Sequence, residues 1–257
     1  MFKFLRIIFV VGPRFIYSYF TWFLRYARNP HKYPIEKRYE RVRSFVTFLL
    51  KHFRVDYQIK GYEHILNQEK PFVLYVNHYS NFDPLVLVAL SKRPISFVAK
   101  RETLKFPLVG KAIKILDSVT IDRDDLRSQV EAFEKTIEQI KLGRDVVIFP
   151  EGTRNRRKDN VIGEFKPGSF KLSYRTGATI IPCALYGTTR PLDIKVRLKK
   201  YPLWLTFFKP IEKEEYLQYN TVSLAPKIHK LVSDEIANFI KEDQKYLLDL
   251  KTKKKKK

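Results

Sequence analysis

The residues best suited to chemistry lie in one short segment, where a histidine is followed five positions later by an aspartate. The segment runs from Asn77 to Pro84, and His78 and Asp83 are its titratable side chains. A neutral imidazole accepts a proton near neutral pH, and a neighbouring carboxylate fixes its tautomer. The pair is therefore the first candidate in the sequence for a general base with a carboxylate partner.

The same spacing occurs a second time in the chain, in a setting that does not favour this chemistry. His229 and Asp234 lie within a helical pattern, where a step of five residues leaves two side chains about 140° apart. We therefore interpret His229 as an ordinary helix residue.

His78, unlike His229, lies between two predicted elements and not within a helix. The strand-like run Phe72–Val76 precedes the segment, and a predicted helix, Pro84–Leu90, follows it. This places His78 on a strand-to-helix loop, where catalytic groups of α/β sheets gather. Asp83 before a proline is also a good helix cap, and capping is compatible with accepting a hydrogen bond from imidazole.

Short apolar runs alternate with helical patterns from about Tyr57 onward. This alternation predicts one α/β domain with a largely parallel or mixed central sheet flanked by helices. The predicted strands are Tyr57–Lys60, Phe72–Val76, Ile95–Ala99, Asp145–Phe149, Thr179–Leu185, Ile194–Leu198 and Leu203–Phe207. The clearest helices are Asp124–Leu142 and Ser223–Leu248, with predicted core faces made by Leu126, Val130, Phe133, Ile137 and Ile140 and by Ile228, Leu231, Val232, Ile236, Phe239 and Ile240.

The two ends of the chain differ in composition from this central part. Residues 1–34 contain eleven aromatic residues and six Lys or Arg, with no acidic residue before Glu36. Arg14 and Arg25 interrupt any spanning stretch, so we expect an interfacial helix that forms a hairpin with a second helix, Ile35–Phe53, in one leaflet. In the alternative interpretation, both helices cover the core with their apolar faces.

These features predict three regions. Residues 1–54 form the membrane-association helices, 55–250 the catalytic domain and 251–257 a disordered tail with six lysines. The tail either approaches anionic lipid or stays solvated. The formal net charge of +23 favours polyanionic partners in general, among them nucleic acid, anionic lipid, phosphorylated substrates and an acidic carrier protein.

At this point the sequence resembles a known family. Asn77–Asp83 is similar to the histidine–four residues–aspartate motif of the glycerolipid acyltransferases, in particular the 1-acyl-sn-glycerol-3-phosphate acyltransferases. Val98–Gly110 resembles the second family block, Phe149–Arg154 the third, and Ile181-Pro182 the fourth. The resemblance covers about Tyr57 to Gly187.

The resemblance implies acyl transfer to the sn-2 hydroxyl of 1-acyl-glycerol 3-phosphate, which gives phosphatidate. His78 would be the base, Asp83 its partner, and Lys100 a donor to the developing oxyanion. The phosphate would be bound by Gly152, Thr153, Arg154 and Arg101, with Glu151 orienting the glycerol or Arg154. Gly152 allows close backbone approach and Arg154 can bind phosphate bidentately. In the alternative, Lys100 and Arg101 are plain surface cations.

The expected partners are a membrane phospholipid surface, lysophosphatidate, and an acyl thioester of acyl carrier protein or coenzyme A as co-substrate. We expect no cofactor, no metal and no nucleic acid, and a peripheral or monotopic location on the cytoplasmic face of the cell membrane. Cys183 lies in an apolar run and is interpreted as a buried hydrophobe. Three alternatives remain: acylation of glycerol 3-phosphate or another lysophospholipid, a basic nucleic-acid-binding protein, and a non-catalytic membrane-binding protein.

Overall fold

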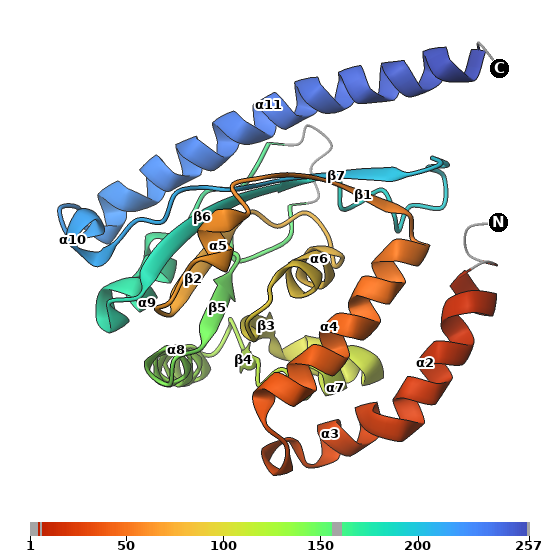
Figure 1. Cartoon of the computed structure of the whole chain (residues 1–257). Helices are drawn as coiled ribbons and strands as arrows, with labels where there is room; N and C mark the ends of the chain where they lie inside the picture. Colours follow the sequence, from red (N-terminus) through yellow and green to blue (C-terminus); the bar gives the residue numbers. More distant parts are fainter. Residues whose placement is uncertain (1–4, 6, 156–160, 256–257) are drawn as a thin grey trace.

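Seven strands form one sheet at the centre of the molecule, in the order β1-β7-β6-β2-β5-β3-β4 (Figure 1). The computed structural model describes residues 5, 7–155 and 161–255. The strands are β1 Val55–Lys60, β2 Phe72–Val76, β3 Ile95–Lys100, β4 Val119–Ile121, β5 Asp145–Ile148, β6 Thr179–Tyr186 and β7 Tyr201–Phe207. All neighbours are parallel except β6 and β7, so the predicted mixed, largely parallel sheet is confirmed.

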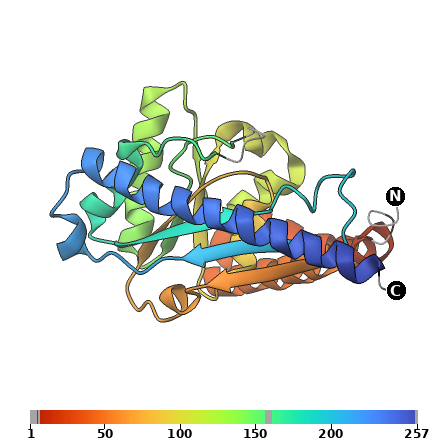
Figure 2. The same ribbon diagram turned by 90° about the horizontal axis from the view of Figure 1, so that it is seen from above.

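Helices cover both faces of this sheet. The described helical segments before β3 are η1 Ile7–Val11, α2 Gly12–Ser18, η2 Tyr19–Phe23, α3 Leu24–Arg28, η3 Pro30–Lys32, α4 Ile35–His52, α5 Glu63–Leu66 and α6 Asp83–Leu90. Those after β3 are η4 Arg101–Lys105, α7 Pro107–Ile115, α8 Leu126–Lys141, α9 Pro167–Thr176, α10 Lys213–Tyr216 and α11 Thr221–Lys255. Figures 1 and 2 show α11 crossing the sheet on the face opposite α4.

The central strands of the sheet send alternate side chains into two separate cores. In β2, Leu74 and Val76 belong to the core beneath α4 and α6, whereas Val73 and Tyr75 belong to the core beneath α9 and α11. Alternation follows from the two-residue period of a strand, and burial on both faces explains why β2 is apolar throughout. The sheet is thus the middle of three layers, and its strand ends can carry a site.

The N-terminal segments η1 to α3 follow one another as a continuous helical run beside α4 (Figure 1). Tyr26 on α3 and Val42, Val46 and Leu50 on α4 lie in the same core as the sheet. The predicted two-helix hairpin is therefore present, and its inner side covers the core. The run Ile7–Arg28 is also long enough and apolar enough to cross a membrane, with a mean hydropathy of 1.4, which the positions of its arginines had argued against.

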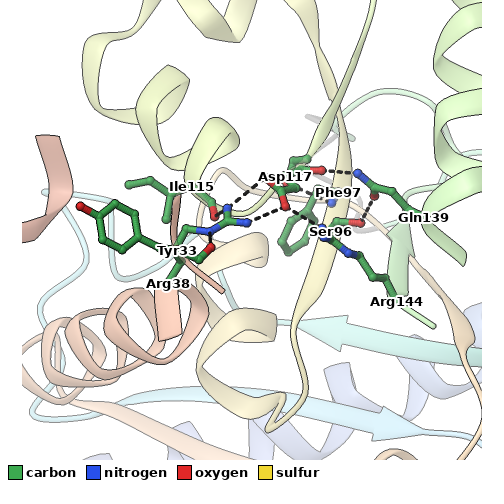
Figure 3. Close-up of polar contacts among 9 residues, drawn as sticks. Tyr33, Arg38, Ser96, Phe97, Ile115, Asp117, Gln139 and Arg144 are labelled. Atoms are coloured by element: carbon green, nitrogen blue, oxygen red, sulfur yellow. Dashed lines mark hydrogen bonds and ion pairs between the residues drawn. The ribbon is translucent and has the colours of Figure 1, made fainter. Parts of the chain in front are cut away.

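An ion-pair network joins α4 to the turn after α7 and to the start of β5 (Figure 3). The guanidinium of the buried Arg38 binds both carboxylate oxygens of Asp117, at 2.9 and 2.7 Å, and donates to the backbone oxygens of Tyr33 and Ile115. Arg144, before β5, donates to the same carboxylate at 2.7 Å. One aspartate thus ties together α4, the turn after α7 and the start of β5.

The strand predicted at Ile194–Leu198 is wrong. These residues lie in the loop between β6 and β7, where Asp193 accepts a hydrogen bond from the backbone N–H of Lys195 and Ile194 is 67% exposed. Alternating apolar and basic residues imitate a strand, but this loop lies outside the sheet. Conversely, β4 was not predicted, because its three residues are too few to show a period.

Two helix predictions also differ in detail from the structure. Leu126 and Val130 were assigned to the core but are 74% and 56% exposed, because no other described element covers them, while Ile137 and Ile140 are buried. Leu231 on α11 is likewise 40% exposed. The predicted disordered tail was 251–257: residues 251–255 continue α11, and 256–257 lie outside the described residues. Extending a helix adds one hydrogen bond per residue, and Lys is a good helix former.

Candidate active site

The Asn77 side chain holds the loop after β2 to β6 through two hydrogen bonds of the kind that join neighbouring strands. Asn77 is fully buried, and its amide donates to the Leu185 carbonyl and accepts from the Leu185 N–H, both at 2.8 Å. These two bonds continue the β2–β6 pairing by one position beyond Val76. The next residue, His78, therefore leaves the sheet at a fixed point and in a fixed direction.

His78 and Asp83 form the pair that their spacing predicted. The imidazole Nδ1 lies 2.7 Å from the Oδ2 atom of Asp83, which is fully buried at the start of α6. The same Oδ2 accepts the backbone N–H groups of Tyr79 and Ser80 at 2.8 and 2.9 Å. Because a carboxylate accepts and does not donate, Nδ1 carries the proton and Nε2 has its lone pair free.

Two further contacts fix the ring of His78 in place. Its imidazole stacks on the Phe149 ring, with centroids 3.9 Å apart and planes 20° apart. Its backbone carbonyl accepts the N–H of Asn155 at 2.7 Å. Both partners come from the segment after β5, the strand next to β2 in the sheet. The histidine side chain keeps 16% exposure, so the ring remains accessible at one edge.

Glu151 connects His78 to a second loop. One carboxylate oxygen accepts the backbone N–H of His78 at 2.6 Å and the other accepts the N–H of Gly163 at 2.7 Å. A Cβ atom at position 163 would lie only 2.9 Å from this carboxylate, so the contact requires glycine. Glu151 is buried, and burial raises its pKa to about 7, although its two N–H partners act to lower it. In the structure Glu151 positions His78, whereas the family resemblance implied a contact with Arg154 or the glycerol.

The turn after Glu151 contains the predicted phosphate-binding residues. Gly152 adopts a left-handed φ of 71°, Thr153 is exposed, and Arg154 is half-buried. Within the described part of the chain, Arg154 forms no hydrogen bond or ion pair. A cation that has no partner among the described residues and lies next to the His78 loop is suited to bind an anionic group.

Lys166 lies beside the turn at Gly152, and no role was predicted for it from the sequence. Its N–H donates to the Pro150 carbonyl at 3.0 Å, which fixes the backbone just before α9. Its ammonium would lie 3.0 Å from a Cβ atom at Gly152, so the side chain crosses the turn that carries Arg154. The only signal in the sequence was a basic residue before the Pro167-Gly168 helix start.

Lys100 and Arg101 are not joined to this group of residues. Lys100 ends β3 and forms an exposed ion pair with Glu102 at 2.7 Å. The Arg101 guanidinium donates to the Ser128 hydroxyl at 3.0 Å and lies 4.0 Å from the Asp122 carboxylate. Since β5 separates β3 from β2, these cations start roughly 10 Å from the His78 loop.

The two residues that we set aside are structural. Cys183 is fully buried in β6, and burial raises the pKa of its thiol. His229 lies on α11 against the Phe165 ring, and Asp234 pairs with Lys230 at 2.8 Å.

In residues 5, 7–155 and 161–255, no three His, Cys, Asp or Glu side chains gather as a metal site would require.

Comparison with known proteins agrees with this arrangement. A family model described as Acyltransferase matches residues 56–186, which include the paired histidine and aspartate and the turn with Arg154. A solved structure of the 1-acyl-sn-glycerophosphate acyltransferase PlsC from Thermotoga maritima has the same fold, with a TM-score of 0.69 at 23% identity over 92% of this chain and 97% of that one.

Several curated proteins are similar along the sequence. A probable 1-acyl-sn-glycerol-3-phosphate acyltransferase of Mycoplasma genitalium is 32% identical over 246 residues, covering 88% of each chain. Its counterpart in Mycoplasma pneumoniae is 32% identical and covers 84% of this chain and 85% of that protein. The chloroplastic enzyme LPAT1 of Arabidopsis thaliana is 36% identical over 130 residues, 51% of this chain and 36% of that protein. The chain therefore belongs to the acyltransferase family.

Proposed function

We propose that this protein transfers an acyl group from a thioester to the sn-2 hydroxyl of 1-acyl-glycerol 3-phosphate, giving phosphatidate. The observation that carries the proposal is the His78–Asp83 pair, which leaves the imidazole Nε2 available just after β2. Arg154 precedes Asn155, whose N–H binds the His78 carbonyl, and it has no partner among the described residues. The names of the similar proteins supply the acceptor.

The reaction follows from these positions. Nε2 of His78 takes the proton of the acceptor hydroxyl while its oxygen attacks the thioester carbonyl, so that a C–O bond forms and negative charge develops on the carbonyl oxygen. Asp83 stabilises the imidazolium through the Nδ1–H bond. When the C–S bond breaks, the leaving thiolate takes the proton from the imidazolium, and the base is ready for another turnover.

The acceptor phosphate would bind at the turn after Glu151. Arg154 offers two parallel N–H donors, and Lys166 offers a second positive charge beside Gly152. Lys100 would have to leave Glu102 before it could bind a carbonyl oxygen, so its part in stabilising the oxyanion, like the phosphate contact of Arg101, stays a prediction.

The site of this reaction would be the cytoplasmic surface of the cell membrane. The apolar run Ile7–Arg28 keeps Ile8, Phe9, Ile16, Tyr17 and Phe20 exposed on its outer side. Such a surface is costly in water and favourable at a lipid interface. The donor would be an acyl thioester of coenzyme A or of acyl carrier protein, with no other cofactor.

A thioester-release assay tests the reaction. Wild type is offered lysophosphatidate, glycerol 3-phosphate and a lysophosphatidylcholine, each with both donor types, and we expect turnover with lysophosphatidate. His78→Ala should lower kcat about 10²- to 10⁴-fold while vesicle binding is retained. Unchanged turnover in this variant would remove His78 from the mechanism.

A second comparison tests the phosphate contact. Arg154→Ala should raise KM for the acceptor and leave KM for the donor unchanged. Arg197→Ala removes an exposed cation from the loop between β6 and β7 and serves as the matched control. An equal rise in both KM values for Arg154→Ala would contradict a phosphate role, and preference for glycerol 3-phosphate would redirect the proposal to that acceptor.

A further inference from the structure

A groove away from the catalytic loop separates the N-terminal helical run from α7. Its walls are Tyr19, Phe20 and Leu24 on one side and Leu104, Pro107 and Gly110 on the other, and its volume is about 770 Å³. Cavities of this size hold drug-sized ligands. None of His78, Asp83, Glu151 or Arg154 lines it, so it is distinct from the proposed active site.

The groove changes from apolar to cationic along its length. A second hollow of about 790 Å³ shares Ala27, Arg28 and Lys114 with the first and continues it toward Lys32 and Lys135. Arg28 ends α3 and Lys114 lies near the end of α7, and both line both hollows, so the ends of these two helices bring the two cations to one place. The opposite end is aromatic and aliphatic except for Lys111, whose ammonium lies 5.9 Å from the centroid of the Tyr19 ring.

The cations at the shared end have no acidic partner. Within the described residues, neither Arg28 nor Lys114 forms a hydrogen bond or ion pair, and both are exposed. Of the two acidic residues in the second hollow, Asp117 is bound by Arg38 and Arg144, which leaves Glu138. The positive charge at this end therefore exceeds the negative charge and is open to an anion.

The apolar end continues onto exposed surface. Phe106, Leu108 and Val109, at the start of α7, are 63%, 45% and 47% exposed, and Phe20 on the facing helix is 69% exposed. Contiguous exposed apolar residues next to an apolar groove mark a surface that contacts lipid or another protein. Basic residues interleaved with aromatic ones favour lipid, because Lys and Arg reach phosphates while their stems stay in the apolar layer.

We propose that this groove binds one anionic phospholipid of the leaflet, with its headgroup phosphate between Arg28 and Lys114 and an acyl chain against Tyr19, Leu24 and Leu104. Such a lipid would fill the space between the N-terminal run and α7 and hold the two together. The proposal does not depend on acyl transfer, since no catalytic residue takes part.

Calorimetric titration of the full chain in maltoside detergent tests this site. The probes are dihexanoyl phosphatidylglycerol, which is a phosphodiester anion, and dihexanoyl phosphatidylcholine, which has no net charge. The experiment uses a His78→Ala background so that chemistry plays no part. We expect the anionic probe to bind at least tenfold more tightly than the zwitterionic one, and equal affinities would overturn the headgroup assignment.

Variants locate the binding. Arg28→Gln with Lys114→Gln should weaken phosphatidylglycerol binding at least tenfold, whereas Arg197→Gln with Lys241→Gln, which removes the same charge from exposed positions elsewhere, should change it less than twofold. Leu24→Trp fills the apolar end and should weaken binding of both probes. Equal losses in the two double variants, or unchanged affinity in Leu24→Trp, would refute the groove as the site.

Discussion

At the scale of single residues, the imidazole that we propose as the general base is oriented by several neighbours, each with a different contact. Asp83 fixes the tautomer of His78, Phe149 fixes its plane, and Glu151 and Asn155 hold its backbone from the N–H and the carbonyl side. These contacts leave the Nε2 atom of His78 as the ring nitrogen that can accept a proton. The arrangement requires a buried carboxyl group at Glu151, and the raised pKa of this group makes the site sensitive to pH.

Replacing the carboxylate of Asp83 tests the tautomer argument. Asp83→Asn keeps the size of the side chain but removes the charge that stabilises the imidazolium, and we expect kcat to fall about 10²- to 10⁴-fold. Steady-state kinetics measure the effect. Asp125→Asn, at the cap of α8, is the control and should leave kcat unchanged. Similar activity of Asp83→Asn and wild type would show that the pair has no catalytic role.

Glu151 should make the protein less stable as pH rises. Its folded pKa of about 7 lies above the ordinary 4.5, so between these values the folded state keeps a proton that the unfolded state has lost. Its contribution to the free energy of unfolding is therefore full below pH 4.5 and declines by about 3 kcal/mol up to pH 7.

Denaturant unfolding of wild type and Glu151→Gln at pH 5 and pH 8 measures this contribution. Burial also raises the pKa of Asp145 to about 7, so only the difference between the two proteins isolates Glu151. We expect the variant to lose less stability than wild type between the two pH values. A parallel decline in both proteins would mean that Glu151 does not titrate in this range.

At the scale of elements, the N-terminal hairpin has two different sides. Its inner side joins the core through Tyr26, Val46 and Leu50, and its outer side exposes large apolar residues. Because the inner side of the hairpin is part of the core, deleting the hairpin would expose that core to water. Single substitutions on the outer side are therefore better tests of membrane contact than deletion of residues 1–34.

Phe9→Asp should weaken vesicle binding at least about tenfold, because it replaces a ring that enters the lipid interface with a charge. Co-sedimentation with vesicles of mixed phosphatidylglycerol and phosphatidylcholine measures the binding. Leu126→Asp on α8 is the matched control, since Leu126 and Phe9 are both 74% exposed. If both variants bind as wild type does, a different surface contacts the membrane.

The network around Asp117 holds α4 against the rest of the fold (Figure 3). Asp117→Asn keeps a residue that tolerates the left-handed φ of 48° but leaves the buried Arg38 without its counter-charge, at a cost of about 3 kcal/mol. Denaturant unfolding measures the loss. Asp234→Asn breaks the exposed pair with Lys230 and should cost less than about 0.5 kcal/mol.

The same network predicts a second pH dependence, opposite in sign to that of Glu151. Burial acts to raise the pKa of Asp117, but hydrogen bonds and charge from Arg38 and Arg144 lower it below 3.8 overall. Its stabilisation is present above pH 4 and is lost as pH falls through the folded pKa. Asp117→Asn should therefore lose less stability than wild type in this acid range, and an equal loss would contradict the assignment.

At the scale of the whole molecule, positive charge and apolar surface lie together. The C-terminal end of α11 and the start of the N-terminal run both lie toward the same side of the molecule in the two views (Figures 1 and 2). The net charge of +23 adds long-range attraction to an anionic surface, which salt screens. We interpret this end as the one that approaches the leaflet.

Removing residues 251–257, which include six lysines, tests this orientation. Each lysine near an anionic surface contributes on the order of 1 kcal/mol at low salt, so the truncated protein should bind phosphatidylglycerol vesicles at least tenfold more weakly. Binding to phosphatidylcholine vesicles should not change. An equal affinity of both proteins for the anionic vesicles at low salt would place the tail in solvent.

The sequence by itself determined the parts of the site that are local. The strand Phe72–Val76, the loop and α6 follow from their own residues, and a spacing of five across a strand-to-helix loop brings His78 to Asp83 without help from the rest of the chain. Periodicity also predicted the sheet class and the long helices, because burial of one face imposes its own spacing.

Only the tertiary structure decided the contacts between distant segments. Glu151 reaches the His78 backbone, 73 residues earlier, and Asn77 pairs with Leu185, 108 residues later, because β5 and β6 flank β2 in a strand order that local patterns do not contain. The packing of distant segments also decides that Leu126, predicted to be in the core, is exposed and that Ile194, predicted to be in a strand, lies in a loop. A pattern shows which residues could be buried, and the packing of other elements decides whether anything covers them.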